Sequence, residues 1–167
     1  MIKKNLNKNF LINFSIVLSI FLIDRFSKLY VIHLSDKNNS VELFSSKFIN
    51  IHLIWNEGIA FGLFSYAEDY LYNLITIIIL IIIFFLLIMI LKSNGIKKFF
   101  LFMIFGGAIG NIYDRFVYKA VPDFLDFHIG SFHWFIFNIA DIFISIGVFF
   151  MILFEIIDNN LTKDEKY

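Results

Sequence analysis

An uncharged stretch of eighteen residues, from Leu74 to Leu91, constrains the fold more than any other feature of the sequence. As a helix it would rise about 27 Å, close to the ~30 Å hydrocarbon core of a bilayer. A helix on the surface of a soluble domain is apolar on one face only, whereas this stretch is apolar all round. We therefore expect a transmembrane helix over about 72–91.

The composition extends this interpretation to the whole chain. Of its 167 residues, 59% are hydrophobic, 20% are aromatic and 17% are charged, whereas soluble domains are about half apolar and about a quarter charged. The absence of cysteine excludes disulfides and thiol catalysis. The net charge of +0 gives no field that would attract nucleic acid, and we expect no nucleic-acid partner.

Three further spans are expected over about 10–30, 99–115 and 136–157. Each reaches membrane length only by including polar residues. Four spans place both termini on one side of the membrane, and the loops on that side carry more lysine and arginine than the opposite loops. This bias favours cytoplasmic termini. The first apolar run lacks the small-residue pattern of a cleavage site, which favours a retained span over a signal peptide.

The two long connections then face outward and have structure of their own. Residues 48–53 alternate apolar and polar, which predicts a half-buried strand. Residues 60–72 are expected to include a short amphipathic helix at the membrane interface. Residues 121–126 are expected to form an apolar loop that carries Asp123 and Asp126 and returns the chain to the membrane.

Three acids on different spans lie at one predicted depth. Counted from the cytoplasmic ends of their helices, Asp24, Asp114 and Asp141 lie at about 21, 22 and 24 Å. A single Asp near a helix end can reach the interface and have no function. A charge in hydrocarbon costs at least about 2.5–3.5 kcal/mol, so three at one level favour a shared polar site open to the outer side.

The neighbours of these acids repeat a pattern. Asn111 and Asp114, like Asn138 and Asp141, have the spacing N-x-x-D, which places amide and carboxylate on one helix face. These amides could equally serve as polar contacts between helices. Asp24 and Lys28 have the spacing of an i,i+4 ion pair.

Two neighbouring carboxylates in a site of low polarity share one proton, and one can activate water while the other protonates the substrate. This is the chemistry of aspartic proteases. The alternatives are a small proton or ion carrier, which the apolar cytoplasmic halves of the spans oppose, and an inactive helical scaffold. His128 and His133 beside Asp126 are a weak metal signal, and we expect neither a metal nor a cofactor.

Five motifs, in order, resemble the lipoprotein signal peptidases (signal peptidase II) of bacteria: LIDRFSK (22–28), WNEGIAFGLF (55–64), GGAIGNIYDR (106–115), VPDFLDF (121–127) and FNIADIFISIG (137–147). The chain departs from the family pattern at Ile59, Pro122 and Phe135. The resemblance implies an intramembrane aspartic endopeptidase that removes signal peptides from prolipoproteins, cleaving before the diacylglyceryl-modified cysteine.

The resemblance also implies an architecture: an all-α polytopic membrane protein of one domain (1–167), with four transmembrane helices, a small extracytoplasmic β-cradle and a short interfacial helix. We expect a monomer in the bacterial inner membrane, with its active site toward the outer side.

Carried over motif by motif, the catalytic pair would be Asp123 and Asp141. Asp114 would orient the site through a salt bridge to Arg115. Depth alone marks Asp114, whereas the family motif marks Asp123. The residues expected to support the site or hold the first span are Asn56, Asn111, Asn138, Asp24 and Lys28.

Overall fold

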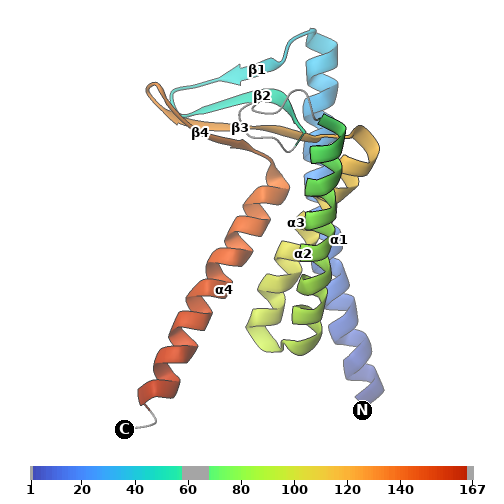
Figure 1. The fold of residues 1–167 in the computed structure, drawn as a ribbon, viewed down its shortest axis with the longest axis vertical. Helices are drawn as coiled ribbons and strands as arrows, with labels where there is room; N and C mark the ends of the chain where they lie inside the picture. The colour runs from blue at the N-terminus through green and yellow to red at the C-terminus, as the bar shows by residue number, and fades with distance from the viewer. Residues whose placement is uncertain (1, 58–67, 165–167) are drawn as a thin grey trace.

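The computed structural model describes residues 2–57 and 68–164. The described helices are α1 (Ile2–Asn38), α2 (Glu68–Lys92), α3 (Gly95–Tyr118) and α4 (Ile139–Asp164). The described strands are β1 (Glu42–Ser45), β2 (Ile49–Asn56), β3 (Val121–Ile129) and β4 (Phe132–Phe137). Figure 1 shows α4 diverging from the other helices as it runs away from the sheet, and the N-terminal end of α1 and the C-terminal end of α4 both lie at the end of the molecule away from the sheet.

Among the described residues, three helices are long and apolar enough to cross a membrane: Tyr72–Lys92, Gly95–Tyr118 and Ile139–Ile157. The first two contain the ranges 72–91 and 99–115 that the sequence predicts as helices, and their crossing of a membrane stays a prediction. The expected span over 136–157 begins later, at Ile139, because Ile136 and Phe137 belong to β4. The expected span over 10–30 lies within α1, which is not among these candidates and carries Asp24, Arg25 and Lys28 in its second half.

The polarity of the helical part is reversed relative to a soluble protein. Lys28, Asp114 and Asn138 are 0% exposed, whereas Phe84 on α2 is 59% exposed. Soluble proteins bury apolar side chains and almost never bury a lysine fully. Apolar surface outside and charge inside is the distribution expected of helices surrounded by lipid.

Small residues bring α3 close to its neighbours. A Cβ added at Gly107 would lie 2.6 Å from the backbone oxygen of Ala140 on α4, and one at Gly110 would lie 2.5 Å from Asp24 Oδ2 on α1. Both distances are too short for any side chain. The small residues at 106–110 therefore allow α3 to approach both neighbouring helices closely.

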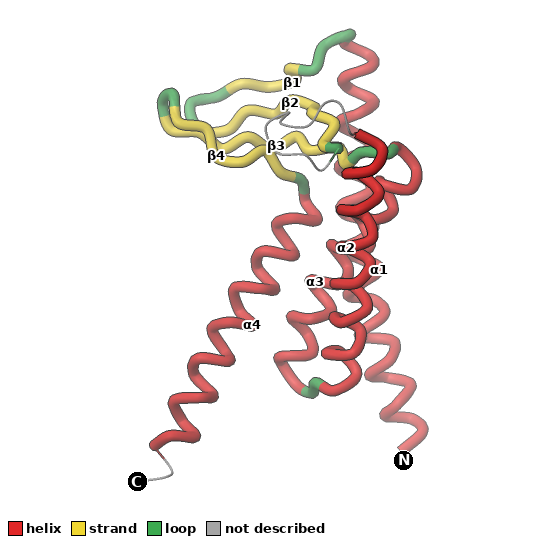
Figure 2. Tube along the Cα trace, in the orientation of Figure 1, coloured by secondary structure: helices red, strands yellow, loops and turns green. Residues whose placement is uncertain are grey.

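The four described strands form one antiparallel sheet in the order β1-β2-β3-β4. Figure 2 shows this sheet beside the upper ends of the helices, above α4. β2 contains the strand predicted over 48–53 apart from its first residue. The short interfacial helix predicted over 60–72 lies mostly outside the described residues, and the described part, from Glu68, begins α2.

The expected loop over 121–126 is wrong, because these residues form the first part of β3. Trp55 pairs with Pro122, and Ile54 pairs with Asp123. Proline lacks an N–H for the ladder and is tolerated near the start of a strand or at an edge. Pro122 satisfies this rule, since the pairing of β3 with β4 begins only at Leu125.

Candidate active site

Asp123 lies at the junction of sheet and helices and is held by two asparagines. Asn56, the last residue of β2, donates from Nδ2 to Asp123 Oδ2 at 2.8 Å. Asn138, between β4 and α4, donates from Nδ2 to Asp123 Oδ1 at 2.6 Å. Both carboxylate oxygens of Asp123 are therefore held by hydrogen bonds, and the residue is only 3% exposed.

Asp141 lies in the first turn of α4 and is also held by amides. Asn111 on α3 donates from Nδ2 to Asp141 Oδ1 at 2.8 Å. The backbone N–H of Asn138 donates to Asp141 Oδ2 at 3.1 Å, and the N–H of Asp141 donates to Asn138 Oδ1 at 3.1 Å. This reciprocal pair caps the N-terminus of α4, a position that favours a negative charge.

Asn138 joins the two acids. Its amide nitrogen reaches Asp123, while its amide oxygen and its backbone N–H both bond to Asp141. Asn138 is itself 0% exposed, so its orientation is fixed by these contacts and not by solvent. Through Asn138, the N-x-x-D pattern at 138–141 thus couples Asp123, an acid on a strand, to Asp141, an acid on a helix.

The surroundings of Asp123 favour its protonated form. Burial raises the pKa of Asp123 to about 6, the hydrogen bonds from Asn56 and Asn138 oppose this rise, and the neighbouring charge of Asp141 adds to it. An acid whose proton affinity is raised by a neighbouring acid is typical of a pair that shares a proton. Within the described residues, neither Asp123 nor Asp141 forms an ion pair.

A second pair of acids lies on the bundle side and is neutralised by cations. Lys28 Nζ lies 2.8 Å from Asp24 Oδ2 and 2.7 Å from Asp114 Oδ2, and Arg25 also pairs with Asp114. Asp24 Oδ1 accepts the backbone N–H of Ala140 at 2.9 Å, which ties α1 to the first turn of α4. The i,i+4 pair of Asp24 and Lys28 expected from the sequence is confirmed.

Lys28 also connects the two groups of acids. It donates to Asn111 Oδ1 at 2.8 Å, while the amide nitrogen of Asn111 donates to Asp141. The oxygen of Asn111 therefore faces the cation and its nitrogen faces the acid. Asp24, Asp114 and Asp141 belong to one polar network, as their matched predicted depth indicates.

The expected salt bridge between Asp114 and Arg115 is wrong. Neighbouring residues on a helix point in different directions, and Asp114 faces α1. Its partners in the described structure are Arg25 and Lys28. Two nitrogens of the buried Arg115 side chain, Nε and Nη1, have no hydrogen-bond partner among the described residues.

Sequence reasoning missed the role of Arg25 and of Tyr72. Arg25 follows Asp24 directly in the sequence. Because a second buried cation needs a second acid, Arg25 could have indicated an ion pair with another acid of the site. The hydroxyl of Tyr72 donates to the backbone oxygen of Arg115 at 2.6 Å, which fixes α2 against the end of α3. No pattern in the sequence indicates that contact.

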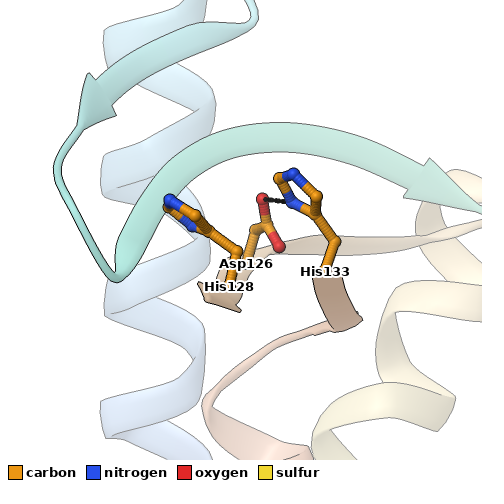
Figure 3. A group of neighbouring side chains, drawn as sticks. All are labelled: Asp126, His128 and His133. Carbon is orange, nitrogen blue, oxygen red and sulfur yellow. Dashed lines mark hydrogen bonds and ion pairs between the residues drawn. The ribbon is translucent and has the colours of Figure 1, made fainter. Parts of the chain in front are cut away.

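A group able to hold a metal lies elsewhere on the sheet, where donor atoms of Asp126, His128 and His133 come within 4.8 Å of one another. Figure 3 shows the carboxylate of Asp126 between the two imidazole rings.

The comparison with protein families matches most of the chain. A family model described as signal peptidase (SPase) II covers residues 16–157. The lipoprotein signal peptidase of Pelagibacter ubique (strain HTCC1062) is 52% identical over 159 residues, which are 95% of this chain and 96% of the relative. That of Aquifex aeolicus (strain VF5) is 40% identical, covering 83% of this chain and 82% of the relative.

Solved structures of bacterial membrane enzymes have a similar fold. One covers 90% of each chain with a TM-score of 0.66 and 28% sequence identity. Another covers 84% of this chain and 90% of its own, with a TM-score of 0.69 and 29% identity.

Proposed function

Because the chain belongs to the signal peptidase II family of proteases, we propose that it cleaves prolipoproteins on the amino side of their diacylglyceryl-modified cysteine, using Asp123 and Asp141. The observation that carries this proposal is the bridge through Asn138, which couples two acids that form no ion pair within the part of the chain that the structure describes. Asp24 and Asp114, by contrast, are buried and form ion pairs with Lys28 and Arg25.

The environment of each acid supports a division of roles. Asp123, whose pKa is raised to about 6 mainly by burial, is the member that holds the proton. Asp141 receives amide donors at a helix N-terminus, which stabilise a carboxylate. In the proposed reaction Asp141 removes a proton from water, the water oxygen attacks the scissile carbonyl, and Asp123 donates its proton to the carbonyl oxygen.

Collapse of the resulting gem-diol completes hydrolysis. The carbon–nitrogen bond breaks, the amine of the modified cysteine takes the proton held by Asp141, and Asp123 recovers its proton from the diol. One water is consumed and one peptide bond is broken, with no net change in the protonation of the pair. Asn56, Asn111 and Asn138 keep the two carboxylates oriented through these steps.

We propose that the whole chain (1–167) is one domain with four membrane spans. In this proposal α1 is a membrane span in addition to the three candidate helices. The charged residues of α1 support this, since Asp24 and Lys28 are 0–1% exposed and face other helices. The sheet would then lie on the outer side of the bacterial inner membrane and both termini in the cytoplasm. Figure 1 agrees with this placement, because both chain ends lie at the end away from the sheet. We also propose that the protein is a monomer.

The test is cleavage of a synthetic prolipoprotein by the purified full-length protein in detergent, read by mass spectrometry. We expect a product that begins at the diacylglyceryl-modified cysteine, and no product when the same peptide lacks the lipid. Asp36→Asn, which alters an exposed acid on α1, is the matched control for variants of the pair and should cleave normally. Cleavage at another bond, or cleavage independent of the lipid, would contradict the proposal.

A further inference from the structure

Three metal-binding side chains converge on the hairpin formed by β3 and β4. Asp126 and His128 are two residues apart on β3, so they emerge on the same face of the strand, and His133 on β4 is the direct partner of His128. The imidazole rings of the two histidines are stacked, with centroids 5.0 Å apart. Figure 3 shows the ring of His133 in contact with the carboxylate of Asp126 and the ring of His128 on the other side of that carboxylate.

The contacts within this group leave ligand atoms unused. His133 Nδ1 lies 2.8 Å from Asp126 Oδ2, and Asn50 on β2 donates to the same oxygen at 3.2 Å. The other oxygen, Asp126 Oδ1, is buried and has no hydrogen-bond partner among the described residues, and the same holds for His128 Nδ1. Asp126 is only 1% exposed. A buried carboxylate oxygen without a partner is costly, and an imidazole nitrogen of the same group is in the same condition.

We propose that Asp126, His128 and His133 bind a divalent transition-metal ion of the zinc class. Two imidazole nitrogens and one carboxylate oxygen are a donor set that zinc uses, with a fourth position left for water. Donor atoms of the three side chains already lie within 4.8 Å of one another. Ligands around a zinc ion at about 2.0–2.2 Å need only a small further approach, in which the hydrogen bond between Asp126 and His133 gives way to metal bonds.

The site is open to ions from the surface of the sheet. A cavity of about 360 Å³ is lined by Asp126 and His133 together with Glu42 and His52, among other residues. The side chain of His133 is 52% exposed, which provides the entry path. The acids and imidazoles along this cavity attract a cation and could guide it to the buried carboxylate.

The metal would fasten the hairpin and not take part in hydrolysis. Asp126 lies three residues beyond Asp123 on β3, where the pairing of the strands is locally irregular. Side chains an odd number of residues apart on a strand point to opposite faces, so Asp126 and Asp123 lie on opposite faces of β3. Metal bonds from β3 and β4 would join the strands where their register shifts, between Asp126 and His128. The site is thus independent of the proposed peptidase reaction.

The experiment uses untagged full-length protein in detergent, loaded with zinc, dialysed, and assayed for bound metal by mass spectrometry. We expect about one zinc per chain in the wild type and in His33→Asn, an exposed histidine outside the group. We expect its loss in His128→Asn and in His133→Asn. Equal zinc in all four proteins, or none in the wild type, would overturn the proposal.

A second measurement does not depend on folding of the variants. Diethyl pyrocarbonate modifies accessible histidine nitrogens, and peptide mass spectrometry locates the modified residues. In the wild-type protein, zinc should slow modification of His133 at least several-fold and leave His33 unchanged. Equal protection of both histidines, or protection of neither, would contradict the site. Cleavage of prolipoprotein is not the readout, so failure of the peptidase proposal would leave this result interpretable.

Discussion

Two pairs of acids lie near one another, all buried except the half-buried Asp141, and they differ in what holds them. Asp24 and Asp114 are bound by Lys28 and Arg25, whereas Asp123 and Asp141 are bound by asparagines and backbone N–H groups. A cation keeps an acid ionised and fixes its charge. An amide orients an acid but leaves it able to gain or lose a proton.

In the proposed mechanism, this difference separates the pair that holds the bundle together from the pair that catalyses hydrolysis. The cation-bound pair links α1 to α3 and α4, and removal of one member would leave an uncompensated charge inside the protein. The amide-bound pair links the sheet to α3 and α4. We therefore assign different roles to Asp114 and Asp123, although the membrane depth predicted from the sequence marks only Asp114 as a residue of the site.

The largest expected effect is loss of catalysis at the amide-bound pair. Asp123→Asn and Asp141→Asn each remove one member of the proton-sharing pair at nearly constant volume. We expect the cleavage rate to fall by about 10²–10⁴-fold, the usual contribution of a general acid or base. The measurement is the cleavage rate of lipidated peptide, with Asp36→Asn as control; normal cleavage by either variant would remove that residue from the mechanism.

At the cation-bound pair the expected effect is on stability. Asp114→Asn leaves Lys28 and Arg25 without their shared partner in a site where Lys28 and Asp114 are 0% exposed. Breaking a buried ion pair in this way costs about 3–5 kcal/mol. Denaturant unfolding in detergent should show this loss for Asp114→Asn. If Asp114→Asn instead cost less than about 0.5 kcal/mol, like an exposed-site change, the contrast between the two pairs would disappear.

A smaller effect is expected where α3 approaches α4. Gly107→Ala places a methyl group 2.6 Å from the backbone oxygen of Ala140, next to the turn that carries Asp141. The helices must separate, at a cost of about 1–3 kcal/mol, and cleavage should slow because Asn111 and Asp141 lie on opposite sides of that contact. Gly106→Ala is the comparison, since its methyl meets the Ile20 side chain at 3.1 Å; a larger effect at Gly106 would show that the α3–α4 contact is not the sensitive one.

The smallest expected effect is a shift in the pH profile. Since the proposed acid Asp123 has a pKa raised to about 6, chiefly by burial, kcat/KM should fall as pH rises through about 6 and Asp123 loses its proton. Asn56→Ala removes a hydrogen bond that lowers this pKa, so the fall should move to higher pH. A profile that stays flat across this range, or that moves to lower pH in Asn56→Ala, would argue against Asp123 as the proton donor.

The same pKa shift has a defined sign in folding stability. Between the ordinary value of 3.8 and about 6, the folded protein holds a proton on Asp123 that the unfolded chain has released. Stability should therefore fall as pH rises through this window in the wild type. Asp123→Asn lacks this contribution, so the difference in unfolding free energy between the two proteins should change across the window.

Much of the helical part could be predicted from the sequence because hydropathy and helical rise are local properties. They locate the apolar stretch at 72–91 and place Asp24, Asp114 and Asp141 at one depth, where the structure joins them in one network. The strand over 48–53 follows from its alternation in the same way. Residues 121–126 have no such local signal, and only pairing with β2 makes them a strand.

By itself, the sequence determined that this chain forms apolar helices with acids and asparagines at matched levels, and its motifs indicated the family. Only the tertiary structure decided which acid meets a cation and which meets an amide. Asp114 turns from its neighbour Arg115 toward α1, and Asp123 is placed beside Asn138 by the sheet. The physical reason is that ion pairs and shared protons depend on distances of a few ångströms between elements far apart in the chain, and helical periodicity specifies a face but not the partner opposite it.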